Sequence, residues 1–210
     1  MLKPVMKDVF SIASNDAELG VELVGYIIVK EGHIVAIDPP MLPGLPQALS
    51  VLGKVDAVII TSFAHLRGAP FLARLTGSKL FIPLVQDTPR LDRKDFIRFH
   101  HLENAENYDE NTSLPLGLKA TYVRGENVEG NVWFNEMFLS MGKTVFGGDA
   151  ARGEREKLII FPQGIFPDAE GKIVNANRKV LSGVLSRLKP ENYMGGHGEP
   201  VIGKPEAFKL

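Results

Sequence analysis

Three residues that could bind a metal or transfer a proton lie just after apolar stretches of the sequence. His65 and Asp149 each follow a continuous apolar run, and His197 lies in a glycine-rich loop after a shorter one. Continuous apolar runs are typical of buried strands, and α/β folds expose functional groups in the loops after such strands. We therefore expect these three side chains to meet at one edge of a sheet.

Two imidazoles and a carboxylate are a suitable ligand set for a catalytic zinc or a non-haem iron, with coordination positions left for water or substrate. Other interpretations stay open. An aspartate after a strand often caps a turn, and a histidine among glycines can simply bond to the backbone. A catalytic triad of Ser62, one of the two histidines and Asp149 is a weaker alternative, because the sequence lacks the Gly-x-Ser-x-Gly nucleophile elbow.

Two arginines lie close to these residues in the sequence. Arg67 follows His65 by two positions, and Arg152 follows Asp149 by three. Guanidinium groups at the mouth of a site favour a carboxylate or phosphate ligand. The alternative interpretation is that both are solvated surface arginines.

The composition restricts the classes of function. The chain has 210 residues, no cysteine, and 24 basic against 25 acidic residues, for a net charge of −1. The lack of cysteine excludes disulfides and thiolate metal sites. The balanced charge gives no global reason to bind nucleic acid or an anionic membrane, and no apolar run is long enough to cross a bilayer. We expect a cytoplasmic protein with a small-molecule ligand, and a homodimer is one option for its oligomeric state.

The hydrophobic pattern predicts strands first, then a β-α-β unit, then more strands, and finally a helix followed by a strand. The segment 86–114 is polar and is expected to be irregular. The two halves share a pattern of strands followed by a helix and a strand, which suggests a duplicated sandwich with helices outside. The expected strands are 9–13, 24–29, 34–38, 55–61, 79–83, 118–123, 131–134, 143–147 and 158–161, and the expected helices are 47–52, 68–76 and 177–188.

The stretch 55–83 resembles the metal-binding segment of the metallo-β-lactamase superfamily. Ile37-Asp38-Pro39, Phe146-Gly-Gly-Asp149 and Gly196-His-Gly-Glu-Pro200 extend the resemblance, which runs from about Val9 to Gly203. The resemblance implies an α/β (α+β) protein with a four-layer αββα sandwich, formed by residues 1–210 as one domain. It also implies a site at one edge of the two sheets.

The sequence departs from the family pattern at specific ligands. Family members carry His-x-His-x-Asp-His, whereas the segment here is two residues shorter and keeps only the last histidine, as His65. Ala64 replaces the motif aspartate, and Ser62 stands at or near a leading histidine. Glu126 stands where a later Gly-His-Thr-x-Gly loop supplies another histidine. The resemblance therefore implies that all three histidines of a first metal site are lost.

The same resemblance implies that three of the four ligands of a second site remain, as His65, Asp149 and His197. Two hypotheses follow. In the first, the protein is a hydrolase with a single divalent metal, zinc or alternatively iron or manganese. Asp149 or Glu126 would then take the proton, and a small anionic substrate would contact Arg67, Arg152 and Ser62. In the second, the protein is a metal-free, inactive member of the fold that binds a ligand or a partner.

Overall fold

The computed structural model describes residues 2–16, 20–85, 92–128, 131–164, 168, 170–208 and 210. Within these residues, no helix combines the length and apolarity that crossing a membrane requires.

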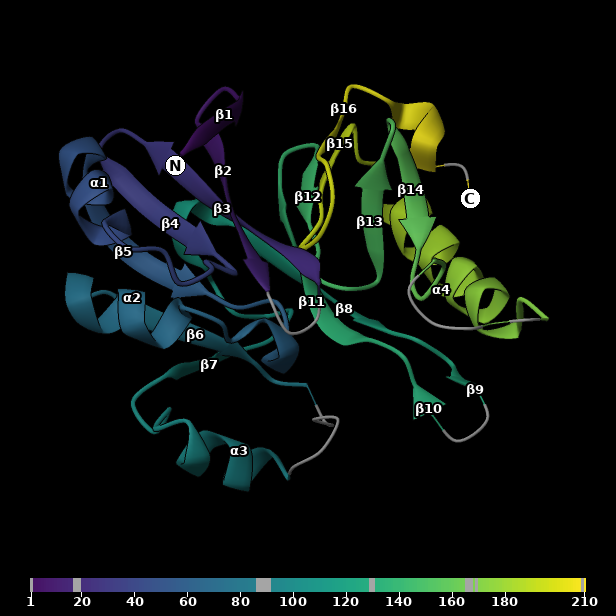
Figure 1. Ribbon diagram of the computed structural model, residues 1–210, viewed down its shortest axis with the longest axis horizontal. Coiled ribbons are helices and arrows are strands. Elements are labelled where there is room, and N and C mark those ends of the chain that lie inside the picture. The colour runs from purple at the N-terminus through teal and green to yellow at the C-terminus, as the bar shows by residue number, and fades with distance from the viewer. Residues whose placement is uncertain are drawn as a thin grey trace.

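A seven-stranded sheet contains the strands of the first half of the chain in their sequence order (Figure 1). Pairing is antiparallel from the first strand to the fourth and parallel from the fourth to the seventh. The three inner strands of the parallel part are mostly buried, which explains their continuous apolar runs. The strands are β1 (Lys3–Met6), β2 (Val9–Asp16), β3 (Val21–Lys30), β4 (His33–Ile37), β5 (Lys54–Ile59), β6 (Lys79–Pro83) and β7 (Glu106–Tyr108).

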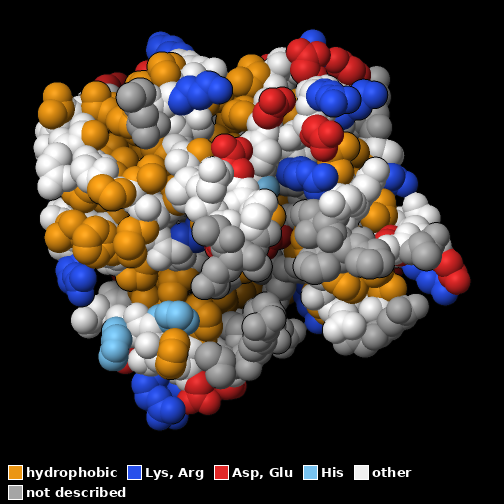
Figure 2. Space-filling view, in the orientation of Figure 1, with side chains coloured by type: hydrophobic (Ala, Val, Ile, Leu, Met, Phe, Trp, Pro, Cys, Tyr) orange, Lys and Arg blue, Asp and Glu red, His pale blue; other side chains and the backbone are white. Residues whose placement is uncertain are grey.

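Helices connect the parallel strands of this sheet. Both α1 (Leu45–Leu52) and α2 (Ala69–Thr76) begin with proline in the first turn, and each is followed by a glycine. The short helix α3 (Arg93–Phe99) comes between β6 and β7. Figure 2 shows hydrophobic side chains gathered over α1 and α2, on the left of the view.

A five-stranded sheet forms the second half, in the order β16-β15-β12-β11-β8. Only β12 and β15 pair in parallel in this sheet. The long helix α4 (Lys172–Leu188) packs against β8 and β14. The strands are β8 (Lys119–Arg124), β11 (Asn135–Met141), β12 (Thr144–Phe146), β15 (Asn192–Met194) and β16 (Val201–Ile202), with the separate pairs β9 (Asn127–Val128)/β10 (Asn131–Val132) and β13 (Ala151–Glu154)/β14 (Lys157–Ile160). The 3₁₀ helices are η1 (Phe63–His65), η2 (Pro115–Gly117) and η3 (Pro205–Phe208).

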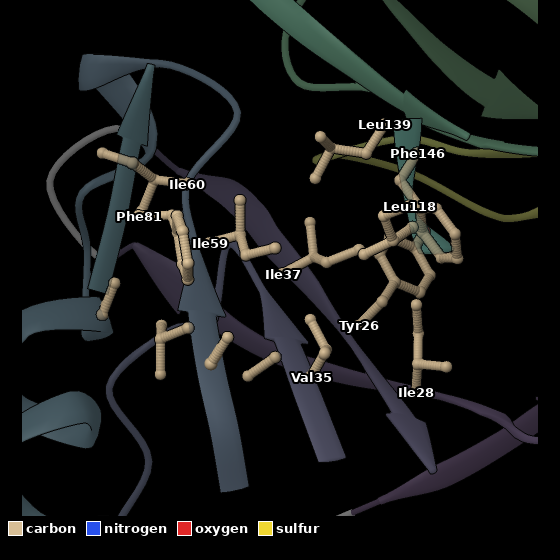
Figure 3. Close-up of a cluster of buried hydrophobic side chains, with 14 of the residues drawn as sticks. Tyr26, Ile28, Val35, Ile37, Ile59, Ile60, Phe81, Leu118, Leu139 and Phe146 are labelled. Atoms are coloured by element: carbon tan, nitrogen blue, oxygen red, sulfur yellow. The ribbon is translucent and has the colours of Figure 1, made fainter. Parts of the chain in front are cut away.

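The two sheets pack face to face. Tyr26 and Ile37 of the first sheet point toward Leu139 and Phe146 of the second (Figure 3). Side chains alternate along β11, so Leu139 joins this inner core while its neighbour Phe138 joins the core beneath α4. With α1 and α2 outside one sheet and α4 outside the other, the layers confirm the αββα sandwich expected from the sequence (Figure 1).

The structure corrects several expected elements. The segment 86–114, expected to be irregular, contains α3 and β7, although residues 86–91 lie outside the described residues. Asp92 caps α3 by accepting a hydrogen bond from the Lys94 N–H at 2.8 Å. The strand expected at 131–134 is only the short β10, while β11 and β13 were not expected. The helix expected from residue 177 begins at Lys172.

Candidate metal centre

His65, Asp149 and His197 lie together where strands of both sheets end. His65 ends η1, which follows β5, while Asp149 follows β12 and His197 follows β15. Since β12 and β15 are parallel neighbours, their carboxyl ends lie at the same edge. The Met137 N–H of β11 donates to the Thr61 carbonyl at 2.8 Å, which joins the second sheet to the loop that carries His65.

The three side chains place their ligand atoms close together. The Nε2 atoms of His65 and His197 lie 3.0 and 3.1 Å from Oδ1 of Asp149, and all three ligand atoms fall within 4.8 Å of one another. A tetrahedral zinc with bonds of about 2.0–2.2 Å separates its ligands by about 3.4 Å. His65 is buried, and the other two are partly exposed. Small side-chain movements would therefore admit a cation between these three atoms.

Hydrogen bonds at the opposite ring atoms orient both imidazoles. His65 Nδ1 lies 2.8 Å from Oδ2 of Asp38, and His197 Nδ1 lies 2.7 Å from the carbonyl oxygen of Glu22. A carbonyl oxygen can only accept, so His197 donates from Nδ1, and Nε2 is the ring atom that would bind a cation. Histidines that bind metals have second-shell partners of this kind. The donor set and its surroundings fit a divalent cation.

Asp38 is the buried anchor of the His65 ring. The Asp38 side chain is only 2% exposed and accepts from the backbone N–H of Thr61 at 2.7 Å and from its hydroxyl at 2.6 Å. Asp38 belongs to one of the sequence motifs that resemble the family, but no role in the site was predicted for it. The signal that identified Asp149, an acid directly after an apolar strand, also marks Asp38.

Glycines let the two loops of the second sheet press against His65. A Cβ on Gly148 would lie 3.1 Å from Cε1 of His65, and one on Gly196 would overlap that atom. The Gly196 N–H donates to the Gly148 carbonyl at 3.1 Å, so the loops also hold each other. Positions 148 and 196 must therefore both hold glycine, the residue without a Cβ.

The charges of the cluster are coupled. Burial lowers the pKa of His65, but the carboxylates of Asp149 and Asp38 outweigh it and raise that pKa to about 9. Burial raises the pKa of Asp149, yet the neighbouring His65 and His197 hold it well below its usual range. His65 and Asp149 thus form an ion pair at neutral pH. A bound cation would take the place of the proton on Nε2, because a histidine ligand must be neutral.

Glu136 is a buried acid next to the cluster that the sequence analysis did not identify. It lies in β11, and its carboxylate accepts from the N–H groups of Gly148 at 3.0 Å and Asp149 at 2.6 Å. Burial, together with the charge of Asp149, raises the pKa of Glu136 to about 7.

Arg67 reaches the site but engages mainly the backbone. Its guanidinium donates to the carbonyls of Val24 at 2.8 Å and Gly196 at 3.1 Å, and Nη2 lies 3.4 Å from Nε2 of His197. The Arg67 backbone has a φ of +40°, which is uncommon for a residue other than glycine. Arg67 therefore ties the loop of His197 to β3.

The other residues singled out from the sequence lie in different surroundings. Arg152 donates to the Gln163 carbonyl at 2.9 Å. The buried Ser62 hydroxyl has no hydrogen-bond partner within the described part of the chain. Glu126 is exposed and pairs with Lys179 of α4 at 3.6 Å. Among the described residues, the candidate ligand cluster does not include Glu126.

Comparisons with known proteins concern the fold. No protein-family model matches the sequence, and no curated protein does. The DIM-1 metallo-β-lactamase exposed to ceftazidime matches with a TM-score of 0.71 at 15% identity, over 100% of this chain and 94% of that one. The FIM-1 metallo-β-lactamase from Pseudomonas aeruginosa in the mono-zinc form has a TM-score of 0.63 at 14% identity, over 100% and 92%. An archaeal metallo-β-lactamase superfamily protein from Sulfolobus tokodaii has a TM-score of 0.63 at 17% identity, over 96% and 83%. The fold expected from the sequence is thus confirmed: the chain has the metallo-β-lactamase fold.

Proposed function

We propose that this protein is a metallo-β-lactamase-fold hydrolase that uses a single divalent metal held by His65, Asp149 and His197. Zinc is the first choice, with iron and manganese as alternatives. The proposal rests on one observation: three ligand atoms from three separate loops converge while both imidazoles are oriented through Nδ1. The FIM-1 structure in a mono-zinc form supports a one-metal site on this fold.

A divalent metal supplies Lewis acidity and makes water a nucleophile near neutral pH. The chain contributes orientation and a proton acceptor. Asp38 and the Glu22 carbonyl hold the two imidazoles, and both hydrogen bonds of the Asp149 side chain within the described residues use Oδ1. Asp149 Oδ2 is therefore available to accept a proton from water. We favour Asp149 over Glu126 as the base, because Glu126 pairs with Lys179 at the surface.

The substrate is proposed to be small and anionic. Arg67 lies beside His197, whereas only the Cβ of Arg152 lies near Gly198 in the same loop, and its guanidinium pairs with Glu154 at 3.6 Å. Both guanidiniums also hold backbone carbonyls, so they would attract an anion through their charge more than by a bidentate grip. The hydroxyl of Ser62, which has no hydrogen-bond partner among the described residues, is a further candidate contact for a polar substrate group.

Metal content measured by mass spectrometry tests this function, using protein purified without chelator. We expect about one equivalent of metal in the wild type, none in His65→Ala, and the wild-type amount in His33→Ala. His33 is a matched control because it is exposed and pairs with Asp56 on the surface. Zinc at 100 times its dissociation constant should stabilise the wild type by about 2.7 kcal/mol. Metal-free wild-type protein whose melting temperature ignores zinc and manganese would contradict the proposal.

One observation favours a second candidate function, a metal-free protein that binds a ligand without turning it over. The raised pKa of His65 keeps its ring charged, so that the ring can donate to Asp38 and Asp149 together. Arg67 supplies another positive charge next to His197. The buried carboxylates are therefore neutralised by the chain itself. For this function we expect neither zinc nor a chelator to change the melting temperature.

A further inference from the structure

We propose that Glu136 is a positioning residue that fixes the loop of Asp149, so that Oδ1 of Asp149 is already in place when a cation binds. This inference rests on the proposed function, since it assigns Glu136 a part in building the metal centre. Glu136 itself stays outside the ligand cluster found among the described residues.

The carboxylate of Glu136 accepts hydrogen bonds from consecutive backbone N–H groups of one loop. Oε2 accepts from Asp149 N at 2.6 Å, and Oε1 accepts from Gly148 N at 3.0 Å and from Ala150 N at 3.4 Å. Successive N–H groups that converge in this way form a concave site for an anion. Here the anion is part of the protein, and its bonds determine where the backbone of Asp149 lies.

The burial of Glu136 indicates a polar role. The residue is 0% exposed, and burying a carboxylate is costly unless hydrogen bonds compensate for the lost water. Its neighbour Met137 fills the inner core. An apolar residue at position 136 would avoid the cost of a buried charge, but it could not accept hydrogen bonds from the loop. Those hydrogen bonds are therefore the specific contribution of the carboxylate.

The carboxylate also lies directly behind the ligands. A Cβ on Gly148 would be 2.6 Å from Oε2 of Glu136, 2.9 Å from the Thr61 hydroxyl and 3.1 Å from Cε1 of His65. Glu136, Thr61 and His65 therefore surround Gly148, and the backbone at Gly148 has little room to shift. Holding a ligand loop in its bound geometry removes the ordering cost that binding would otherwise carry.

The experiment compares wild type with Glu136→Gln and uses Glu126→Gln as the matched control. The control makes the same chemical change at an exposed residue that pairs with Lys179 on the surface. In Glu136→Gln an amide NH₂ replaces one carboxylate oxygen and cannot accept from a backbone N–H. The first measurement is hydrogen–deuterium exchange of residues 147–151 in the metal-free protein. The second is a cobalt titration followed by absorption.

We expect faster exchange at 147–151 in Glu136→Gln, unchanged exchange in β5, and a cobalt affinity about 10–100-fold below that of wild type. We expect Glu126→Gln to match the wild type in both measurements. The shorter acid in Glu136→Asp keeps the charge, and its cobalt affinity should fall between those of wild type and Glu136→Gln. If Glu136→Gln does not fold, the cobalt affinity of Glu136→Asp is compared with that of wild type alone, and we expect it to be lower.

Wild-type cobalt affinity in Glu136→Gln or, if that variant does not fold, in Glu136→Asp would overturn the proposal. Faster exchange with unchanged cobalt affinity would also overturn it, because Glu136 would then support the loop without serving the ligand. If the wild type itself binds no cobalt, the proposed function fails and this inference fails with it. If only the variant comparison fails, the metal centre stands without a role for Glu136.

Discussion

The loops that carry Asp149 and Glu126 both follow strands of the second sheet, but their surroundings are opposite. After β12, the Asp149 backbone is held by Glu136 and its side chain by His65 and His197. After β8, Glu126 is exposed and contacts Lys179 of α4 at 3.6 Å. One acid is fixed from several sides, and the other is in solvent.

This difference shows which positions are suited to hold a ligand. Buried polar groups must be hydrogen-bonded, so a buried loop that satisfies them has one favoured geometry. An exposed ion pair contributes roughly 0–1 kcal/mol and does not fix a side chain. We therefore expect substitutions around Asp149 and His65 to have large effects and substitutions at Glu126 to have small ones.

The largest effect is expected from Gly196→Ala, because the added Cβ would overlap Cε1 of His65. Forcing an atom into this packed site should lower the free energy of unfolding by about 3 kcal/mol. Metal binding should be lost as well. Urea denaturation measures the first effect and a cobalt titration the second. Gly183→Ala is the control, because a Cβ at that position in α4 meets nothing within 4 Å. Equal stability of the two variants would refute the close packing described here.

The second-largest effect on stability and metal binding is expected from Asp38→Ala. It leaves the buried N–H of Thr61 and Nδ1 of His65 without their acceptor, which should cost about 2 kcal/mol of stability. Loss of this second-shell partner should also weaken metal binding by roughly 10–100-fold. Thermal unfolding and a cobalt titration measure these changes. Asp56→Asn provides the comparison, since the partners of Asp56 are the exposed His33 and Lys54. Similar losses in both variants would mean that Asp38 does not anchor His65.

Several features of the centre could be predicted from the sequence. The ends of apolar strands identified His65 and Asp149, and the same signal was present at Asp38. Glu136 gave no comparable signal, because Asn135 and Glu136 are weak strand formers ahead of an apolar stretch. The hydrogen bonds that make a buried glutamate acceptable come from residues 148–150, which are distant in sequence. No local pattern could reveal them.

The fold shows the same limit. The β-α-β unit was predictable because a proline and a glycine mark the ends of α2, and the same residue types mark the separately expected helix α1. The helix α3 was missed because its residues form no continuous apolar face, and Phe96 and Ile97 are only partly buried. Short elements of this kind depend on tertiary contacts more than on periodicity.

A smaller effect is expected from Arg67→Lys. An ammonium cannot reproduce the two-pronged contact with the carbonyls of Val24 and Gly196, so stability should fall by about 1 kcal/mol. Chemical denaturation measures this, with Arg74→Lys as the control on the outer helix α2. If Arg67→Lys is as stable as wild type, the guanidinium does not tie the loop of His197 to β3.

The smallest effect is expected from Glu126→Gln. Loss of one exposed ion pair should change stability by less than about 0.5 kcal/mol and leave metal affinity unchanged. A calorimetric zinc titration checks the affinity. A tenfold loss would show that Glu126 takes part in the centre, and the contrast between the two loops would then be wrong.

Anomalous diffraction at the zinc edge, from crystals grown with zinc, tests the central claim most directly. We expect one strong peak within about 2.0–2.2 Å of Nε2 of His65, Oδ1 of Asp149 and Nε2 of His197. A map with no peak among these atoms, from crystals that contain zinc, would contradict the account.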